Sequence, residues 1–384
     1  MAERLKIAFI TERFGRQFGG AEAYAVNLCE VLSRQHDVTI IASEFDHSLP
    51  VNEILVKRLK GWPSWIRALH FALKTKKLSY GDFDVVHTHV MGTLGDVHVV
   101  HVVPVRFRRF FMQNRWRGWL SYLQPRNIAY LWLEANSLRE SSKRIVVAVS
   151  PSVKAQISSA YPELNRVEMI TPGARMASAD ATVRSSLRKH LGLDEEDVVC
   201  LLVARDPLLK GFAAVLQALA LLPENYKLLV VGADHLSRNY LLSYHPSLKG
   251  RVNLLEPTSD VSPYYRSADV CVHPTLLDSF GMAPLEAMAH GLPVVLSASQ
   301  YCGFAAFVRH KHDAWVLDDP KDVTEIAEAI FSLGENPDLR ETITRQSRSL
   351  VQAFTWESIA QRYEVLYDQI VSFRKGPQSQ PRSQ

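Results

Sequence analysis

Short apolar runs alternate with stretches of helical spacing along most of the chain. In the first half, residues 21–34 carry apolar side chains at helical spacing, which predicts an amphipathic helix after the first apolar run. The runs expected as strands are 6–11, 37–43, 84–89, 97–103 and 144–150. Strands that alternate with helices indicate a parallel sheet covered by helices on both faces.

The second half repeats this pattern after Thr171-Pro172-Gly173. Its expected strands are 198–204, 227–232, 252–255, 270–273 and 293–296. The sequence therefore predicts an α/β protein with two doubly wound, Rossmann-like domains facing a central cleft, over residues 1–172 and 173–355. Residues 356–374 are expected to form a helix that returns to the first domain, and the polar residues 375–384 a disordered tail.

The composition is that of a water-soluble globular protein. Of the 384 residues, 47% are hydrophobic and 22% are charged, and no apolar run is long enough to span a bilayer. The first residues contain no secretory signal, and the four cysteines form no CxxC pair, so neither a zinc site nor a disulfide framework is predicted. A reducing cytoplasm is the expected location.

Charge is divided unequally between the two halves. Residues 1–172 carry 23 Lys and Arg against 15 Asp and Glu, whereas the remainder carries 21 against 25. Residues 54–81 and 97–133 contain no acid and interleave basic with aromatic side chains, which is typical of a segment lying on anionic lipid. A solvated face and a nucleic-acid surface are the alternatives. The residues expected at the membrane surface are Arg106, Arg108, Arg109, Arg115, Trp116, Arg117 and Trp119.

The most informative run is DSFGMAPLEAMAHGLPVVLS, residues 278–297. Pro284 suits a first helical position, which places Glu286 in the first turn and Gly291 just past the helix end. Asp278 then lies on a strand-to-helix loop beside a helix N-terminus, where open α/β sheets bind ligands and anions. An ordinary crossover with surface acids is the alternative.

Two further loops carry candidate ligand-binding residues. Arg205 and Lys210 follow the expected strand 198–204, and such a pair suits a diphosphate whose charge grows as a bond to it breaks. Gly19 and Gly20 follow the first strand and allow close approach of a ligand to the backbone. The first 60 residues contain no GxGxxG fingerprint, which disfavours a dinucleotide-dependent dehydrogenase.

Four histidines cluster at the ends of two expected strands, at positions 87, 89, 98 and 101. His87 and His89 would share one strand face, whereas His98 and His101 would oppose each other, so the spacing disfavours a metal site. We expect one or two of them to line the cleft and contact a polar substrate. Histidines satisfied by backbone groups are the alternative.

These residues together resemble the retaining glycosyltransferases of family 4, which have the two-domain GT-B fold. The family's acidic signature, E-x7-E followed by a GxPVV strand, corresponds to Asp278-x7-Glu286 and AMAHGLPVV. Arg205 and Lys210 match the family's diphosphate-binding pair, and Gly19-Gly20 matches its loop near the donor phosphate and acceptor.

The resemblance also implies roles for single residues. Glu286 would bind the ribose hydroxyls of the donor, and Asp278 would contact the transferred sugar, as would the backbone of Phe280, Gly281 and Met282. His101 is near the family's cleft-facing histidine, and His98 is an equal candidate. Asp278 replaces the usual Glu and is shorter by one methylene group, so the donor-sugar preference is expected to differ.

The basic first half and the run around HPTLLDSFGMAPLEAMAHGLPV also resemble glucosyltransferases that build the lipopolysaccharide core. The implied activity is transfer of a hexose, with retention, from a nucleotide diphosphate sugar (a UDP-sugar) to a lipid-linked or lipopolysaccharide-core acceptor. The resemblance implies no metal and no cofactor, no nucleic-acid partner, and a peripheral location on the cytoplasmic face of the inner membrane. A sugar-nucleotide epimerase on the same fold and a non-catalytic nucleic-acid-binding protein are the alternatives.

Overall fold

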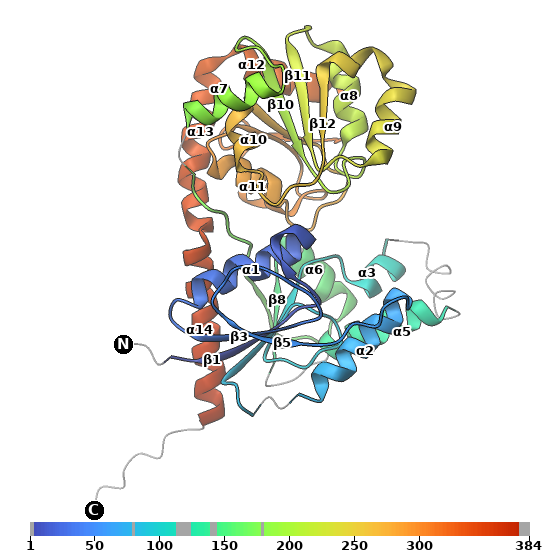
Figure 1. Cartoon of the computed structure of the whole chain (residues 1–384), viewed down its shortest axis with the longest axis vertical. Helices are drawn as coiled ribbons and strands as arrows, with labels where there is room; N and C mark the ends of the chain where they lie inside the picture. Colours follow the sequence, from blue (N-terminus) through green and yellow to red (C-terminus); the bar gives the residue numbers. More distant parts are fainter. Residues whose placement is uncertain (1–3, 79–80, 113–123, 139–143, 178–179, 376–384) are drawn as a thin grey trace, which may run out of the picture. The chain divides into compact units, whose positions relative to one another are not determined.

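The computed structural model describes residues 4–78, 81–112, 124–138, 144–177 and 180–375. The chain forms two compact units, each built on its own parallel sheet (Figure 1). The first unit joins Met1–Pro172 to Trp356–Gln384, and the second is Gly173–Thr355. The chain therefore passes between the units at two points.

Seven parallel strands form the sheet of the first unit, in the order β5-β3-β1-β6-β7-β8-β9. The strands are β1 Lys6–Ile10, β3 Asp37–Ala42, β5 Asn52–Leu55, β6 Val85–Thr88, β7 Val97–Val100, β8 Ile145–Ala148 and β9 Val167–Met169, with β2 Phe14–Gly15 and β4 Phe45–Asp46 as a separate pair. The described helices are α1 Gly20–Leu32, α2 Ser64–Lys76, α3 Val105–Phe110, α5 Pro125–Leu138, α6 Pro151–Ala160 and α14 Trp356–Lys375. The strand order reverses between β1 and β6.

Six parallel strands form the sheet of the second unit, in the order β12-β11-β10-β13-β14-β15. The strands are β10 Val198–Val203, β11 Tyr226–Val231, β12 Val252–Leu255, β13 Val270–His273, β14 Val294–Ser297 and β15 Trp315–Leu317. The described helices are α7 Ala181–His190, α8 Phe212–Leu221, α9 His235–Tyr244, α10 Ser262–Ser267, α11 Met282–Ala289, α12 Val323–Glu335 and α13 Pro337–Val351. Here the strand order reverses between β10 and β13, the position at which open α/β sheets bind ligands.

The C-terminal helix α14 contributes to the core of the first unit. The hydroxyl of Tyr363 lies 2.7 Å from that of Tyr24 in α1, and the hydroxyl of Tyr367 lies 2.5 Å from Nδ1 of His87 in β6. Both tyrosines of α14 are fully buried. The last helix of the chain thus packs on elements from its beginning.

Each strand expected from the sequence is present, with its ends within three residues of the prediction. Three edge strands were not predicted: β5, β9 and β15. β5 reads NEIL and is mostly exposed, and the other two have only three residues each, so none gives a strong apolar pattern. The prediction of two doubly wound α/β domains is confirmed.

Candidate active site

In the second unit, two loops meet at the carboxyl ends of neighbouring strands. One follows β10 and carries Lys210, and the other follows β13 and carries Asp278. The backbone N–H of Leu276 donates to the carbonyl of Leu209 at 3.2 Å, and the Lys210 ammonium donates to the carbonyl of Leu277 at 3.0 Å. These two bonds tie the loops together at the point where the strand order reverses.

Glycines permit this close approach. Gly211 has a φ of +90°, and a Cβ there would lie 2.1 Å from the carbonyl oxygen of Pro274. It is the N-cap residue of α8. Gly281 has a φ of +108°, and a Cβ there would lie 2.6 Å from Sγ of Cys302. A side chain at Gly211 would push the two loops apart, and one at Gly281 would strain the backbone and collide with Cys302.

Lys210, Asp278 and His273 form one polar cluster between the loops. The Lys210 ammonium lies 2.6 Å from Oδ2 of Asp278, and Nε2 of His273 lies 3.0 Å from the same oxygen. Burial alone would raise the pKa of Asp278, but the hydrogen bond from His273 and the charge of Lys210 hold it well below its usual range. Asp278 is therefore a carboxylate at neutral pH, paired with one of the predicted phosphate-binding cations.

The helix that follows, α11, begins earlier than predicted. Gly281 is its N-cap in a left-handed conformation, so Met282 is the first helical residue and Pro284 the third. The prediction that Pro284 opens the helix and Glu286 lies in its first turn is wrong. Pro284 is still tolerated, because an N–H at the third position has no acceptor within the helix. Gly291, with a φ of +77°, lies past the helix end as predicted.

Glu286 points its carboxylate into a buried polar contact. The hydroxyl of Tyr265 donates to its Oε2 at 3.0 Å. Burial raises the pKa of Glu286 to about 7, and the hydrogen bond from Tyr265 opposes this rise. A carboxylate that is half ionised near neutral pH is suited to accept hydrogen bonds from incoming hydroxyl groups.

The segment between Asp278 and Glu286 is held in place by contacts with Cys302 and Phe304. Phe280 is buried, and its carbonyl accepts from the N–H of Phe304 at 2.5 Å and from the Cys302 thiol at 3.3 Å. The Phe280 ring packs against that of Phe304, with centroids 5.4 Å apart. The side chain of Phe280 is therefore part of the core. Met282 is half-buried and more accessible than Phe280.

The remaining predicted residue of this unit, Arg205, is exposed and lies in the same loop as Lys210. Sequence reasoning missed His273 and Tyr265, which hold the two acids. His273 is adjacent to the singled-out run and ends a predicted strand, so its position was a usable signal. Tyr265 lies on α10, and only the folded structure brings it to Glu286.

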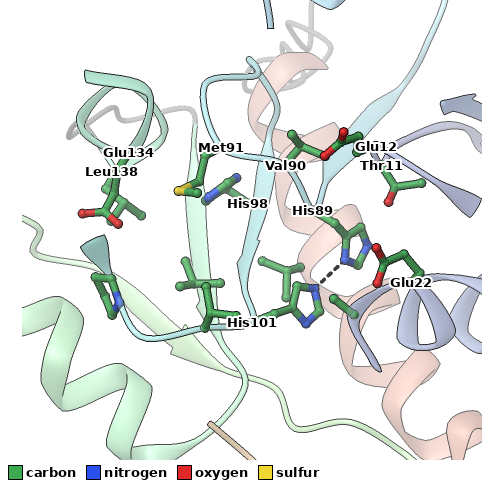
Figure 2. Close-up of a pocket in the computed structure, with 15 residues that line it drawn as sticks. Thr11, Glu12, Glu22, His89, Val90, Met91, His98, His101, Glu134 and Leu138 are labelled. Carbon is green, nitrogen blue, oxygen red and sulfur yellow. Dashed lines mark hydrogen bonds between the residues drawn. The ribbon is translucent and has the colours of Figure 1, made fainter. Parts of the chain in front are cut away.

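The first unit has a cavity of about 220 Å³ at the carboxyl ends of β1, β6 and β7 (Figure 2). It lies where the strand order of that sheet reverses. Its lining includes Thr11, Glu12, Ala21, Glu22, His89, Val90, Met91, His98, Val99, Val100, His101, Val102, Pro104, Glu134 and Leu138. No Lys or Arg is among these described residues. Gly19 and Gly20 lie beside the cavity, because Gly20 is the first residue of α1 and precedes Ala21, which lines the cavity.

Both candidate histidines line this cavity. β7 ends at Val100, so His101 lies beyond the strand, and the expectation that His98 and His101 oppose each other is wrong. Nδ1 of His89 lies 2.7 Å from Nε2 of His101, as Figure 2 shows. Burial lowers the pKa of His98 to about 3 and that of His101 to about 4, so both are neutral at pH 7.

The predicted membrane surface is described only in part. Arg106, Arg108 and Arg109 lie on α3, whereas positions 115, 116, 117 and 119 fall outside the described residues. Large apolar side chains are exposed nearby in sequence, including Phe111 at 55% and Trp132 at 50%. No described helix combines the length and apolarity that a membrane span requires.

Side chains that could bind a metal ion do not gather among the described residues. Within the described ranges, His, Cys, Asp and Glu side chains form no group of three placed to hold a metal ion. The four cysteines are buried and unpaired.

Comparison with known proteins links both units to one family. The sequence profile described as glycosyl transferases group 1 matches residues 183–350, and that of Glycosyltransferase Family 4 matches residues 18–177. The chain is 26% identical to the D-inositol 3-phosphate glycosyltransferase of Xylanimonas cellulosilytica, over 77% of this chain and 74% of that protein.

Solved structures share the fold over nearly the whole chain. WaaG, a glycosyltransferase involved in lipopolysaccharide biosynthesis, is 22% identical with a TM-score of 0.79, covering 95% of this chain and 99% of WaaG. HepE of Anabaena, solved with UDP and glucose, is 18% identical with a TM-score of 0.73, covering 95% of this chain and all of HepE. The two parallel sheets are those of the GT-B fold. The chain belongs to glycosyltransferase family 4 and is a retaining glycosyltransferase that uses a nucleotide sugar.

Proposed function

We propose that the protein transfers a hexose from a UDP-sugar to a lipid-linked or lipopolysaccharide-core acceptor. The observation that carries this proposal is the cluster at the strand reversal of the second unit, where the Lys210 ammonium lies 2.6 Å from Asp278 and the chain continues directly into α11, which carries Glu286. Cations for a diphosphate and acids for hydroxyl groups are the two requirements of a sugar-nucleotide pocket. Residues 173–355 are accordingly the donor-binding domain of the proposal.

Each donor group has a partner in this proposal. Arg205 and Lys210 neutralise the diphosphate, whose negative charge grows as the bond to the sugar breaks. Glu286 accepts hydrogen bonds from the ribose hydroxyls. Asp278 and the backbone of Phe280, Gly281 and Met282 contact the transferred sugar. The HepE complex with UDP and glucose supports UDP as the nucleotide.

The acceptor is proposed to enter the cavity of the first unit, whose lining lies within residues 1–172, the acceptor-side domain of the proposal. His101 contacts the acceptor near its reacting hydroxyl group. Gly19 and Gly20 allow the acceptor to approach the backbone closely. The described lining carries carboxylates and neutral histidines but no Lys or Arg, which supports a neutral hydroxylated acceptor group. The WaaG structure supports a lipopolysaccharide-core sugar, and the inositol phosphate named for a relative is the competing acceptor to include in assays.

Transfer from radiolabelled UDP-glucose tests the proposal. We expect Lys210→Ala to lower kcat/KM by about a hundredfold or more, since a charged hydrogen bond at the leaving group contributes several kcal/mol to the transition state. Lys227→Ala is the matched control, because Lys227 pairs with Asp197 at 3.9 Å away from the site. Equal kcat/KM values for the Lys210→Ala and Lys227→Ala variants would contradict the proposed role of Lys210. Product analysis without acceptor separates a transferase from an epimerase.

The proposal includes peripheral attachment to the cytoplasmic face of the inner membrane through the basic first unit. Arg106, Arg108 and Arg109 carry the described part of this surface, with exposed Phe111 beside them. Each basic residue near an anionic surface contributes about 1 kcal/mol. Sedimentation with phosphatidylserine vesicles should weaken when the three arginines become glutamine, and with added salt. No sedimentation at low salt would remove the attachment.

A further inference from the structure

His273 ends β13 directly below the donor loop and is only 1% exposed. Its Nε2 lies 3.0 Å from Oδ2 of Asp278, the same oxygen that receives the Lys210 ammonium at 2.6 Å. The other oxygen, Oδ1, has a long contact of 3.4 Å from the N–H of Phe280. One carboxylate oxygen is thus shared between a fixed donor and a mobile one.

The two donors differ in what they can do next. Lys210 has a flexible stem and a compact charge, so it can transfer from one anion to another. His273 is held in the strand, and because a carboxylate only accepts, its ring proton is on Nε2. Burial lowers the pKa of His273 below its ordinary value, so the ring is a neutral donor and not a second cation.

We propose that His273 is a positioning residue that holds the Asp278 carboxylate in place while Lys210 moves from Asp278 to the incoming diphosphate. Asp278 pairs with Lys210 and competes with the donor for it. Once Lys210 has moved, the hydrogen bond from His273 keeps Asp278 ionised and aimed at the sugar. This inference rests on the proposed donor site.

A role in packing alone explains His273 poorly. Its neighbours in β13, Cys271 and Val272, are apolar and buried, as expected for an inner strand of a parallel sheet. Nδ1 of His273 is buried and has no hydrogen-bond partner among the described residues. A buried nitrogen without a partner is destabilising, so an apolar residue would serve the core better.

The test measures UDP affinity by isothermal titration calorimetry in a double-mutant cycle. His273→Met removes the hydrogen-bond donor to Asp278 at similar side-chain volume. UDP binding should weaken about tenfold, because Lys210 is then the sole strong partner of Asp278 and stays bound to it. Asp278→Asn frees Lys210 and should leave UDP affinity equal to or a few-fold tighter than wild type. In the Asp278→Asn background, His273→Met should have no further effect on UDP affinity.

Two further variants separate positioning from folding. His273→Gln restores a donor near the position of Nε2 and should recover most of the lost affinity. Val272→Ala opens a cavity in the same strand without touching Asp278 and should leave UDP affinity unchanged. Equal UDP affinity of His273→Met and wild type would overturn the inference, as would an equal loss in both backgrounds.

The outcome remains decisive if His273→Met does not fold. In that case Asp278→Asn alone tests the competition, since weaker UDP binding by this variant contradicts it. Failure of the wild-type protein to bind UDP counts instead against the proposed donor. The two failures are therefore distinguishable.

Discussion

The isosteric substitution Glu286→Gln should stabilise the protein above neutral pH and weaken donor binding. In the wild type, burial raises the pKa of Glu286 from 4.5 to about 7. A group with a raised pKa binds more protons folded than unfolded, so wild-type stability falls as pH rises from about 4.5 to about 7. The amide of glutamine has no such charge, and the variant escapes this loss.

The magnitude follows from the size of this rise. Each tenfold change in acidity is equivalent to about 1.4 kcal/mol, so the ionised carboxylate is destabilising by up to about 3 kcal/mol above pH 7. For a unit of this size, about 3 kcal/mol corresponds to roughly 6–12 °C in Tm. Below about pH 4.5, where Glu286 is protonated in both states, the two proteins should be equally stable.

Donor binding should change in the opposite direction. A hydrogen bond to a charged group contributes about 1.5–3 kcal/mol, so Glu286→Gln should weaken UDP binding by about tenfold to a hundredfold at pH 8. Since protonation removes the same charged hydrogen bond, wild-type affinity should fall by about tenfold to a hundredfold from pH 8 to pH 5, whereas the variant should show no such dependence.

The assays are urea unfolding and UDP calorimetry across this pH range. Glu328→Gln, an exposed carboxylate on α12, is the control and should alter neither quantity. A stability gain for Glu286→Gln that is the same at pH 4.5 and pH 8 would refute the assigned burial. If Glu286→Gln binds UDP as tightly as the wild type does, with the same pH dependence, the ribose contact is refuted.

Three further sets of substitutions test the glycine turn, the sugar contact and the histidines of the cavity. Gly281→Ala should destabilise the protein by about 2–3 kcal/mol in urea unfolding, because of its φ of +108° and the contact with Cys302, and Cys302→Ala in the same chain should recover part of the loss. Asp278→Glu should shift the ratio of kcat/KM for UDP-glucose against UDP-galactose by about tenfold, and an unchanged ratio would contradict a role in sugar selection. His101→Ala should lower kcat/KM for the acceptor by about tenfold or more and His98→Ala by less, and the reverse order would assign the contact to His98.

The sequence was sufficient for the architecture because both sheets are parallel and buried. Inner strands such as β10, which reads VVCLLV, give continuous apolar runs that stand out from the helices around them. Edge strands do not: β5 has three exposed residues of four. The pattern that identifies a strand is a pattern of burial, and it fades where burial ends.

The candidate site was predictable where its residues directly follow predicted strands. Lys210 and Asp278 each follow a predicted strand, so their meeting at one sheet edge is a consequence of topology. The start of α11 was not predictable from Pro284, because the left-handed conformation of Gly281 starts the helix two residues earlier. The contact between Tyr265 and Glu286 arises only from tertiary packing between α10 and α11.

The nucleotide-sugar pocket is proposed to lie in the second unit. Hydrogen–deuterium exchange with and without UDP locates that pocket directly, because bound nucleotide slows exchange of the amides that it contacts or orders. We predict protection in residues 205–212 and 278–286. Protection confined to residues 1–172, or unchanged exchange under saturating UDP, would contradict the account.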